Sequence, residues 1–173
     1  IPVIASGGVG TMAIMLLKKL GFAPIAISRK TAANEFLKKI GASEILNEFI
    51  PQDRPLLKPI FDGAIDTVGG SVLETILKSI KPNGSISICG MALSPSFQTT
   101  VFPFILRGLS MFGIDSAEAQ MKWREELWQK LASEWKPENL ESIAKTVKLI
   151  DIWPEIEKIL KGEQTGRVVI EMT

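Results

Sequence analysis

Small residues cluster near the start of the chain, in the segment Ala5-Ser6-Gly7-Gly8-Val9-Gly10. This segment fits the pattern G-x-G-x-x-G/A of dinucleotide-binding turns, with Ala5 in place of the first glycine. In such a turn Gly7 lets the backbone approach a pyrophosphate, Gly10 lets the next helix pack closely on its strand, and the first helical amides point at the phosphates. A plain structural turn would use the same glycines, but a position between a strand and a helix favours a nucleotide. No Gly-Lys-Ser/Thr follows, which excludes a Walker A phosphate loop.

The residues after the second predicted strand indicate which nucleotide the turn would hold. Sites for NAD usually carry Asp or Glu there, as an acceptor for the ribose 2′-hydroxyl. This chain instead has Ser28-Arg29-Lys30, and its next acid is Glu35. Two cations and a hydroxyl suit a 2′-phosphate, which a carboxylate would repel. The alternative is a solvated basic pair, but cations at the start of a helix oppose its dipole. The sequence therefore favours NADPH over NADH.

Residue types that the chain lacks exclude several kinds of active site. It has no His, no Tyr and one cysteine, Cys89. Without an imidazole there is no Ser-His-Asp or Cys-His nucleophile, and without Tyr there is no tyrosine general acid. One thiol builds neither a zinc cluster nor a disulfide. We predict that Cys89 is a small buried hydrophobe rather than a nucleophile, and that Asp66 satisfies local hydrogen bonds.

The overall charge points to small-molecule partners. Lys and Arg number 20 and Asp and Glu number 19, which gives a net charge of +1 and no field for gathering nucleic acid or membrane lipid. The longest apolar stretches are shorter than the ~20 residues of a spanning helix. A single cysteine fits a reducing compartment. We expect a cytoplasmic protein with no nucleic-acid or membrane partner.

Short apolar runs alternate with helical patterns through the first two thirds of the chain, and these elements must position the turn. Strands are predicted at residues 3–5, 24–28, 44–46, 63–68, 85–89 and 110–114, and helices at 11–20, 32–40 and 72–80. Residues 47–62 contain three prolines and predict a loop, and residues 81–84 predict a turn. This alternation predicts an α/β fold, a Rossmann doubly wound parallel sheet of six strands covered on both faces.

The last third of the chain has a different pattern. A charged amphipathic helix is predicted at residues 117–134, a half-buried strand at 143–149, a helix from Asp151 as its cap to Lys161, and a strand at 167–172, with Gly162 as the helix stop. We place a boundary near Ser116, which gives a nucleotide-binding domain at 1–116 and a C-terminal segment at 117–173. Because the chain opens without Met on an apolar strand-like run, we expect a fragment or an excised domain.

Six segments in order carry a resemblance to a known family. They are Ala5-Ser6-Gly7-Gly8-Val9-Gly10, Ser28-Arg29-Lys30, Gly63-Ala64-Ile65-Asp66-Thr67-Val68-Gly69, Thr99-Thr100-Val101-Phe102-Pro103-Phe104-Ile105-Leu106-Arg107-Gly108, Gly113-Ile114-Asp115-Ser116 and Gly166-Arg167-Val168-Val169. The chain closely resembles the acryloyl-CoA reductases, a group within the zinc-free, quinone oxidoreductase-like branch of the medium-chain dehydrogenase/reductase superfamily. The resemblance covers essentially the whole chain.

The resemblance implies a set of cofactor-binding residues. Pyrophosphate contacts fall on Ser6, Gly7, Gly8 and Val9, 2′-phosphate contacts on Ser28 and Lys30, and nicotinamide contacts on Met91, Ile105 and Ser116. Arg29 stands where the family usually has glycine, and we include it, with Gly10, among the cofactor-binding residues. The family often has a basic residue after the third strand, where this chain has Asn47 and Glu48.

The resemblance also implies an activity and an architecture. In the family, NADPH gives a hydride to the β-carbon of an enoyl thioester, as in acryloyl-CoA to propanoyl-CoA, and a GroES-like catalytic domain precedes the nucleotide-binding domain. Residues 139–173 resemble the part that returns to that domain, and the catalytic residues are expected in its absent portion. We also expect a homodimer through residues 109–114. A quinone oxidoreductase, a zinc-type alcohol dehydrogenase and a non-catalytic NADPH-binding redox sensor remain alternatives.

Overall fold

The computed structural model describes residues 1–5 and 7–172. Within them one parallel sheet is built from β1 (Pro2–Ile4), β2 (Ile25–Ile27), β3 (Glu44–Leu46), β4 (Phe61–Asp66), β5 (Ile80–Ile88) and β6 (Ser110–Gly113). The strand order is β3-β2-β1-β4-β5-β6. The chain winds outward from β1 to β3, then returns to β4 beside β1 and winds the other way. This confirms the predicted doubly wound Rossmann sheet, whose ligands bind where the winding reverses.

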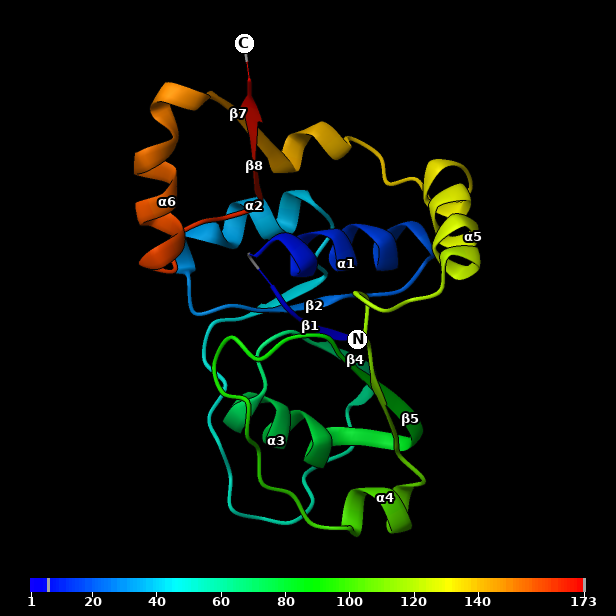
Figure 1. Cartoon of the computed structure of the whole chain (residues 1–173). Helices are drawn as coiled ribbons and strands as arrows, with labels where there is room; N and C mark the ends of the chain where they lie inside the picture. The colour runs from blue at the N-terminus through cyan, green and yellow to red at the C-terminus, as the bar shows by residue number, and fades with distance from the viewer. Residues whose placement is uncertain (6, 173) are drawn as a thin grey trace.

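Helices cover both faces of the sheet. The helices α1 (Gly8–Lys19) and α2 (Asn34–Lys39) lie on one face, and α3 (Gly70–Ser79) and α4 (Phe102–Arg107) lie on the other (Figure 1). Each face has its own apolar core: Ile14 and Leu37 pack under α1 and α2, and Leu73 and Ile76 pack under α3. The i, i+3, i+4 spacing of apolar residues in α3 places them on the side that faces the sheet.

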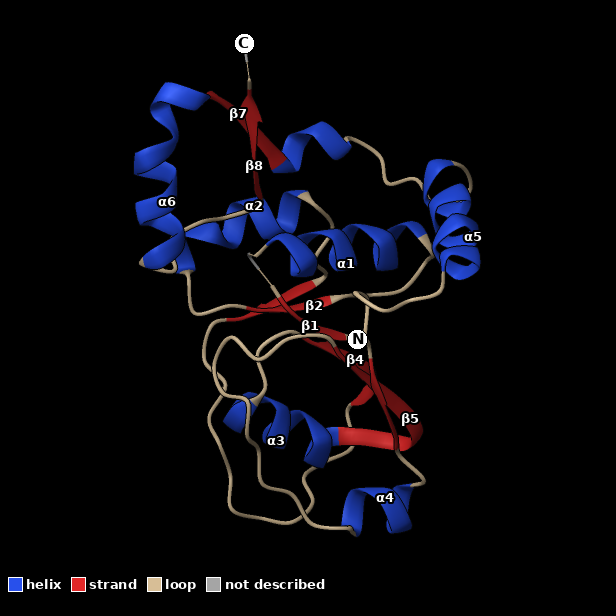
Figure 2. Ribbon diagram, viewed as in Figure 1, coloured by secondary structure: helices blue, strands red, loops and turns tan. Residues whose placement is uncertain are grey.

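The C-terminal segment forms a small unit on the α1/α2 side (Figure 2). After α5 (Met121–Ala132), the strands β7 (Ala144–Lys148) and β8 (Arg167–Glu171) pair in parallel, and α6 (Ile152–Leu160) connects them. The 3₁₀ turn Leu140–Ile143 places Ile143 in the apolar cluster that also contains residues of α1 and α2. This βαβ unit is therefore anchored to the nucleotide-binding fold by buried apolar contact. None of the described helices is long and apolar enough to span a membrane.

Three local features differ from the sequence predictions. The turn predicted at residues 81–84 lies inside β5, where the register against β4 shifts and Asn83 adopts a φ of 62°. The helix α4 was not predicted, because it is short and contains Pro103. Asp151 occupies the cap position of α6, but its side chain makes no capping hydrogen bond, since a 3₁₀ turn (Leu149–Asp151) leads directly into the helix.

Candidate functional site: a dinucleotide cavity at the strand ends

The glycine-rich turn joins β1 to α1, and its glycines have different surroundings. A Cβ on Gly10 would collide with the backbone carbonyl of Ile4 and lie 2.8 Å from the Cα of Ala5. Gly10 is thus required for close packing of α1 on β1. A Cβ on Gly7 would meet nothing within 4 Å, and Gly7 has an ordinary φ of −84°. The fold itself therefore does not need a glycine at Gly7, which leaves its backbone open to a ligand. Ser6 lies outside the described residues.

The amino end of α1 presents donors toward this open space. Gly7 is the N-cap residue, and no side-chain hydrogen bond caps the helix in the described residues. The exposed Val9 follows in the first turn. The first-turn amides have no partner within the helix. Together with the positive end of the helix dipole, they suit an anionic group such as a pyrophosphate.

Arg167 lies against the same turn, and our sequence reasoning gave it no role. It begins β8, and a Cβ on Gly8 would collide with its guanidinium group. The guanidinium therefore stands over the start of α1, where it adds a fork of donors suited to phosphate oxygens. The segment Gly166-Arg167 carries part of the family resemblance, but nothing local in the sequence links Arg167 to Gly8, which lies 159 residues earlier.

The predicted 2′-phosphate residues form a basic corner after β2. The buried hydroxyl of Ser28 accepts a hydrogen bond from the backbone N–H of Lys30 at 3.2 Å. The Lys30 ammonium donates to the carbonyl oxygen of Gln164 at 2.5 Å, and burial lowers the pKa of Lys30, which nearby Glu163 partly offsets. Arg29 is exposed beside them. The structure thus brings together the three residues that the sequence selected.

These residues line a cavity of about 790 Å³ at the carboxyl ends of the strands. Its apolar walls include Ile27, Phe49 and Val72, and its charged lining comprises the cations Arg29, Lys30 and Lys161 and the acid Glu48. Apolar walls with a cationic end suit a flat base that carries a phosphorylated ribose. The resemblance predicts a cation after the third strand, where this chain has Asn47. The Asn47 side chain instead donates to the carbonyl oxygen of Ser28 at 2.7 Å and forms two hydrogen bonds with the side chain of Asn34.

A second cavity of about 610 Å³ lies beyond β4, at the ends of β5 and β6. Met91, Cys89 and Ile114 are among its lining residues. Cys89 is exposed, so our prediction of a buried hydrophobe is wrong: β5 ends at Ile88, and Cys89 already belongs to the loop at the cavity mouth. Partial desolvation by the surrounding residues and the neighbouring Asp66 raise the pKa of the thiol, which favours the protonated form over the thiolate at neutral pH.

Two of the predicted nicotinamide residues are placed differently. Ile105 lies on α4 and is 68% exposed, and Ser116 follows β6 and is exposed. Neither is among the described residues that line the two cavities. The structure therefore brings Met91 to the second cavity and leaves Ile105 and Ser116 outside it.

A buried carboxyl group lies at the end of β4, beside the turn that leads to α3. Asp66 ends β4 and is fully buried, and one of its oxygens accepts the backbone N–H of Gly69 at 2.9 Å. Gly69 and Gly70 have φ values of 70° and 61°, a conformation that favours glycine. Burial raises the pKa of Asp66. As predicted, Asp66 serves local hydrogen bonding: it fixes the turn between β4 and α3, which contributes walls to both cavities.

The described residues contain no group of three or more His, Cys, Asp or Glu side chains that could hold a metal ion. The donors at this site are backbone amides, a hydroxyl and cations, a set suited to phosphates rather than to metals.

The chain is similar to a family of oxidoreductases. Residues 8–133 match the family model described as zinc-binding dehydrogenase. The probable acrylyl-CoA reductase AcuI of Escherichia coli is 37% identical over 97% of this chain and 52% of its own length. The putative quinone oxidoreductase YhfP of Bacillus subtilis is 35% identical over the same shares. The chain spans about half the length of these curated relatives.

Solved structures agree with these relatives. The crystal structure of E. coli K-12 YhdH with bound NADPH matches with a TM-score of 0.92 and 37% identity, over 99% of this chain and 54% of that one. The B. subtilis YhfP structure with NAD bound matches with a TM-score of 0.91 and 34% identity, over 99% and 53%. The turn, the sheet order and these matches agree, and the chain belongs to the zinc-binding dehydrogenase family.

Proposed function

We propose that this chain is the NADPH-binding part of an oxidoreductase that reduces an activated carbon–carbon double bond, with acryloyl-CoA as the expected substrate. The observation that carries the cofactor assignment is the cavity at the strand ends with its cationic corner, together with the amino terminus of α1 after β1, which no side chain of the described residues caps. The substrate assignment is supported by the name of the AcuI relative. The quinone oxidoreductase name of YhfP supports a second substrate class.

The residues present fit NADPH on the chemistry of their donors. The backbone amides of Ser6, Gly7, Gly8, Val9 and Gly10 would hold the pyrophosphate at the start of α1, and Arg167 would neutralise it from above.

The 2′-phosphate would be held in the basic corner of the cavity by Ser28, Arg29 and Lys30. Met91 would line the nicotinamide half, and the roles of Ile105 and Ser116 there remain predictions from the resemblance.

The reaction divides the work between cofactor and protein. With NADPH bound, the double bond of an enoyl thioester would gain a hydride at its β-carbon and a proton at its α-carbon, leaving NADP⁺. The residues of this chain orient and neutralise the phosphates. We assign none of them as the proton donor, and we place that group in a catalytic domain that the C-terminal segment 117–173 would help to complete. The exposed Trp123, Trp128 and Trp153 on α5 and α6 support such a covering domain.

The cofactor assignment is tested by titrating the chain with NADPH and with NADH in a calorimeter. We expect tighter binding of NADPH, and in the Lys30→Gln variant a loss of about tenfold for NADPH with little change for NADH, because one charge-assisted phosphate contact is lost. Equal affinities in the wild-type chain would contradict the 2′-phosphate assignment. NADH is included because the crystal structure of the YhfP relative has NAD bound.

The substrate assignment is tested by NADPH oxidation in the complete protein that contains this chain. Acryloyl-CoA, a quinone and an aldehyde are compared at equal concentration. Preferential turnover of acryloyl-CoA is the expected result. A preference for the quinone would favour a quinone oxidoreductase instead, and a preference for the aldehyde would favour an alcohol dehydrogenase. Tight NADPH binding without turnover of any of the three would favour a redox sensor.

We also propose a homodimer through the edge strand of the sheet. The outer edge of β6 pairs with no other described strand, and Phe112 and Ile114 beside it are about half exposed. An unpaired apolar edge favours pairing with a second copy. Light scattering should give a dimer that Phe112→Glu converts to a monomer, and a monomeric wild-type protein would overturn the proposal.

A further inference from the structure

The basic corner of the large cavity contains a cation that comes from the C-terminal unit. Lys161 follows the last residue of α6 and lines the same cavity as Arg29 and Lys30. Its ammonium has a loose ion pair with Glu157 at 3.7 Å, and both side chains are more than 60% exposed. A lysine at a helix carboxyl end is already favourable through the helix dipole. That effect explains the residue type, but not its place on the cavity wall.

The end of α6 is held in a fixed direction. The backbone N–H of Gly162 donates to the carbonyl oxygen of Ile159 at 2.9 Å, and the backbone N–H of Glu163 donates to the carbonyl oxygen of Lys158 at 2.7 Å. With Gly162 at a φ of 68°, these two bonds form a Schellman motif, which terminates the helix in one defined geometry. The backbone of Lys161 is therefore fixed relative to α6.

A second contact fixes this helix end relative to the corner. The Lys30 ammonium donates to the carbonyl of Gln164, in the loop that follows α6. The carboxyl end of α6 accordingly lies beside the start of α2 (Figure 1). One result is that Lys30 is already engaged by a protein carbonyl. Among the described residues, the partner of the Lys161 ammonium is the exposed Glu157.

The charges around the corner decide what Lys161 adds. Arg29, Lys30 and Lys161 are opposed by Glu48 on the cavity wall and by Glu163, which acts on Lys30. Without Lys161 the two cations and two acids would balance, and a phosphate dianion would gain little net attraction. With Lys161 the corner is positive. From this we infer that Lys161 is a determinant of cofactor choice, reaching from the C-terminal unit to the 2′-phosphate of NADPH. This inference rests on the proposed cofactor site.

The experiment compares Lys161→Gln, Lys161→Arg and Lys122→Gln in the chain. Lys122→Gln removes the same charge from α5, away from the cavity lining. We expect Lys161→Gln to raise the Kd for NADPH about fivefold, the effect of one exposed charge pair, and to leave the Kd for NADH within about twofold. Lys161→Arg and Lys122→Gln should bind both cofactors like the wild type. Competition by 2′-AMP, but not by 5′-AMP, should weaken in Lys161→Gln.

The outcomes separate this inference from the proposed function. Unchanged NADPH binding in Lys161→Gln, or an equal loss for NADPH and NADH, overturns the role of Lys161 and leaves the cofactor site intact. A wild-type chain that binds neither cofactor overturns both. Circular dichroism and thermal unfolding of each variant confirm that the fold is kept, and normal binding by Lys161→Arg shows that the charge, rather than the glutamine, causes the change.

Discussion

Two parts of the candidate cofactor site are built in opposite ways. The β1–α1 turn acts through its backbone: Gly10 is closed in by Ile4 and Ala5, and no side chain is needed to present the amides. The second wall, the segment from α6 to β8, acts through the ends of long side chains: Lys161 lines the cavity, and Arg167 lies against Gly8 of the turn. A backbone surface leaves no room for a side chain where it is packed, as at Gly10, whereas a side-chain surface can exchange one charge for another. We expect the turn and Arg167 to set whether a dinucleotide binds, and Lys161 to set which one.

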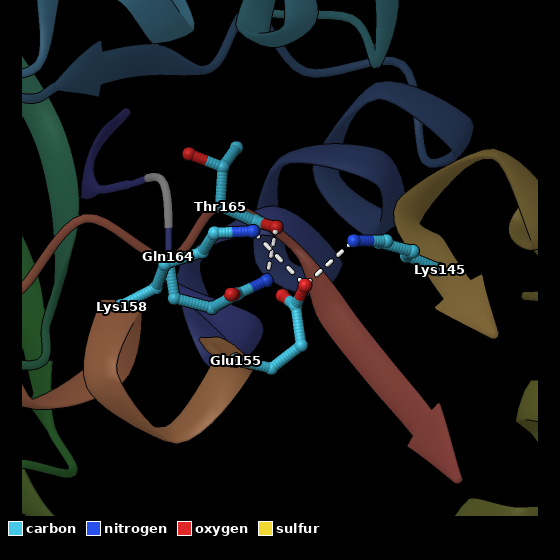
Figure 3. A network of polar contacts seen from close by, with 5 residues as sticks. All are labelled: Lys145, Glu155, Lys158, Gln164 and Thr165. Atoms are coloured by element: carbon cyan, nitrogen blue, oxygen red, sulfur yellow. Dashed lines mark hydrogen bonds and ion pairs between the residues drawn. The ribbon is translucent and has the colours of Figure 1, made fainter. Parts of the chain in front are cut away.

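The second wall depends on a polar network for its position. Glu155 of α6 is only 5% exposed, and its Oε1 accepts from Lys145 of β7 at 2.6 Å and from Lys158 at 2.9 Å (Figure 3). Gln164 and Thr165, in the loop that leads to β8, lie beside this network (Figure 3). The network joins β7 to α6 and so holds the unit from which Lys161 and Arg167 project.

The largest effect is expected at Gly10. Its replacement in Gly10→Val forces side-chain atoms into the backbone of β1, and overpacking costs about 1–3 kcal/mol in unfolding free energy. Collision with backbone rather than with a flexible side chain places the cost at the upper end of this range. Urea unfolding measures the loss, and binding of both NADPH and NADH should fall with it.

Gly7→Ala is the matched variant in the same turn. Because its Cβ meets only open space, the unfolding free energy should change by less than about 0.5 kcal/mol. The Kd for both cofactors should still rise, since the methyl group takes space that the pyrophosphate needs. If Gly7→Ala bound both cofactors like the wild type, the turn would not be the pyrophosphate site.

The next effect is expected at Arg167. The pyrophosphate is common to NADPH and NADH. Arg167→Gln should therefore raise the Kd for both cofactors about tenfold, which is the equivalent of one charge-assisted hydrogen bond. Calorimetry on both cofactors measures this, and Arg167→Lys should recover part of the loss. A loss confined to NADPH would place Arg167 at the 2′-phosphate and would contradict the division of roles along this wall.

The smallest effect on binding is expected at Glu155, where the change is in stability. Lys145 and Lys158 hold the pKa of Glu155 below its ordinary value through their hydrogen bonds. Its folded-state pKa is thus lower than its unfolded one. The stabilisation it gives is therefore complete above the ordinary glutamate pKa of about 4.3 and is lost as the pH falls through the lower folded value.

Glu155→Gln should lower the melting temperature by several degrees at pH 7, and this difference from the wild type should shrink as the pH falls below about 4. The control is Glu157→Gln on the same helix, whose ion pair with Lys161 is long and exposed and adds little stability. Equal melting temperatures for all three proteins at pH 7 would show that the network does not hold the unit in place.

Much of the fold was readable from the sequence because its signals are local. The alternation of strands and helices, the glycine-rich turn and the basic residues after β2 each lie within a few residues of one another, and backbone geometry and helix dipoles act over that range. Predictions failed where tertiary contact overrides the local pattern. Residues 81–84 lie inside β5 because β4 pairs with the residues on either side of them, Ile80 and Ser85. Cys89 is exposed because β5 ends one residue before it.

The sequence by itself determined the doubly wound sheet and where along the chain a dinucleotide turn and a basic corner would lie. Only the tertiary structure decided that the C-terminal unit closes over them and adds Arg167 and Lys161. Those residues are distant from the turn in the chain, and their approach depends on the burial of Ile143 and on the bond between Lys30 and Gln164. Contacts between such distant residues are set by packing and leave no periodic signal in the sequence.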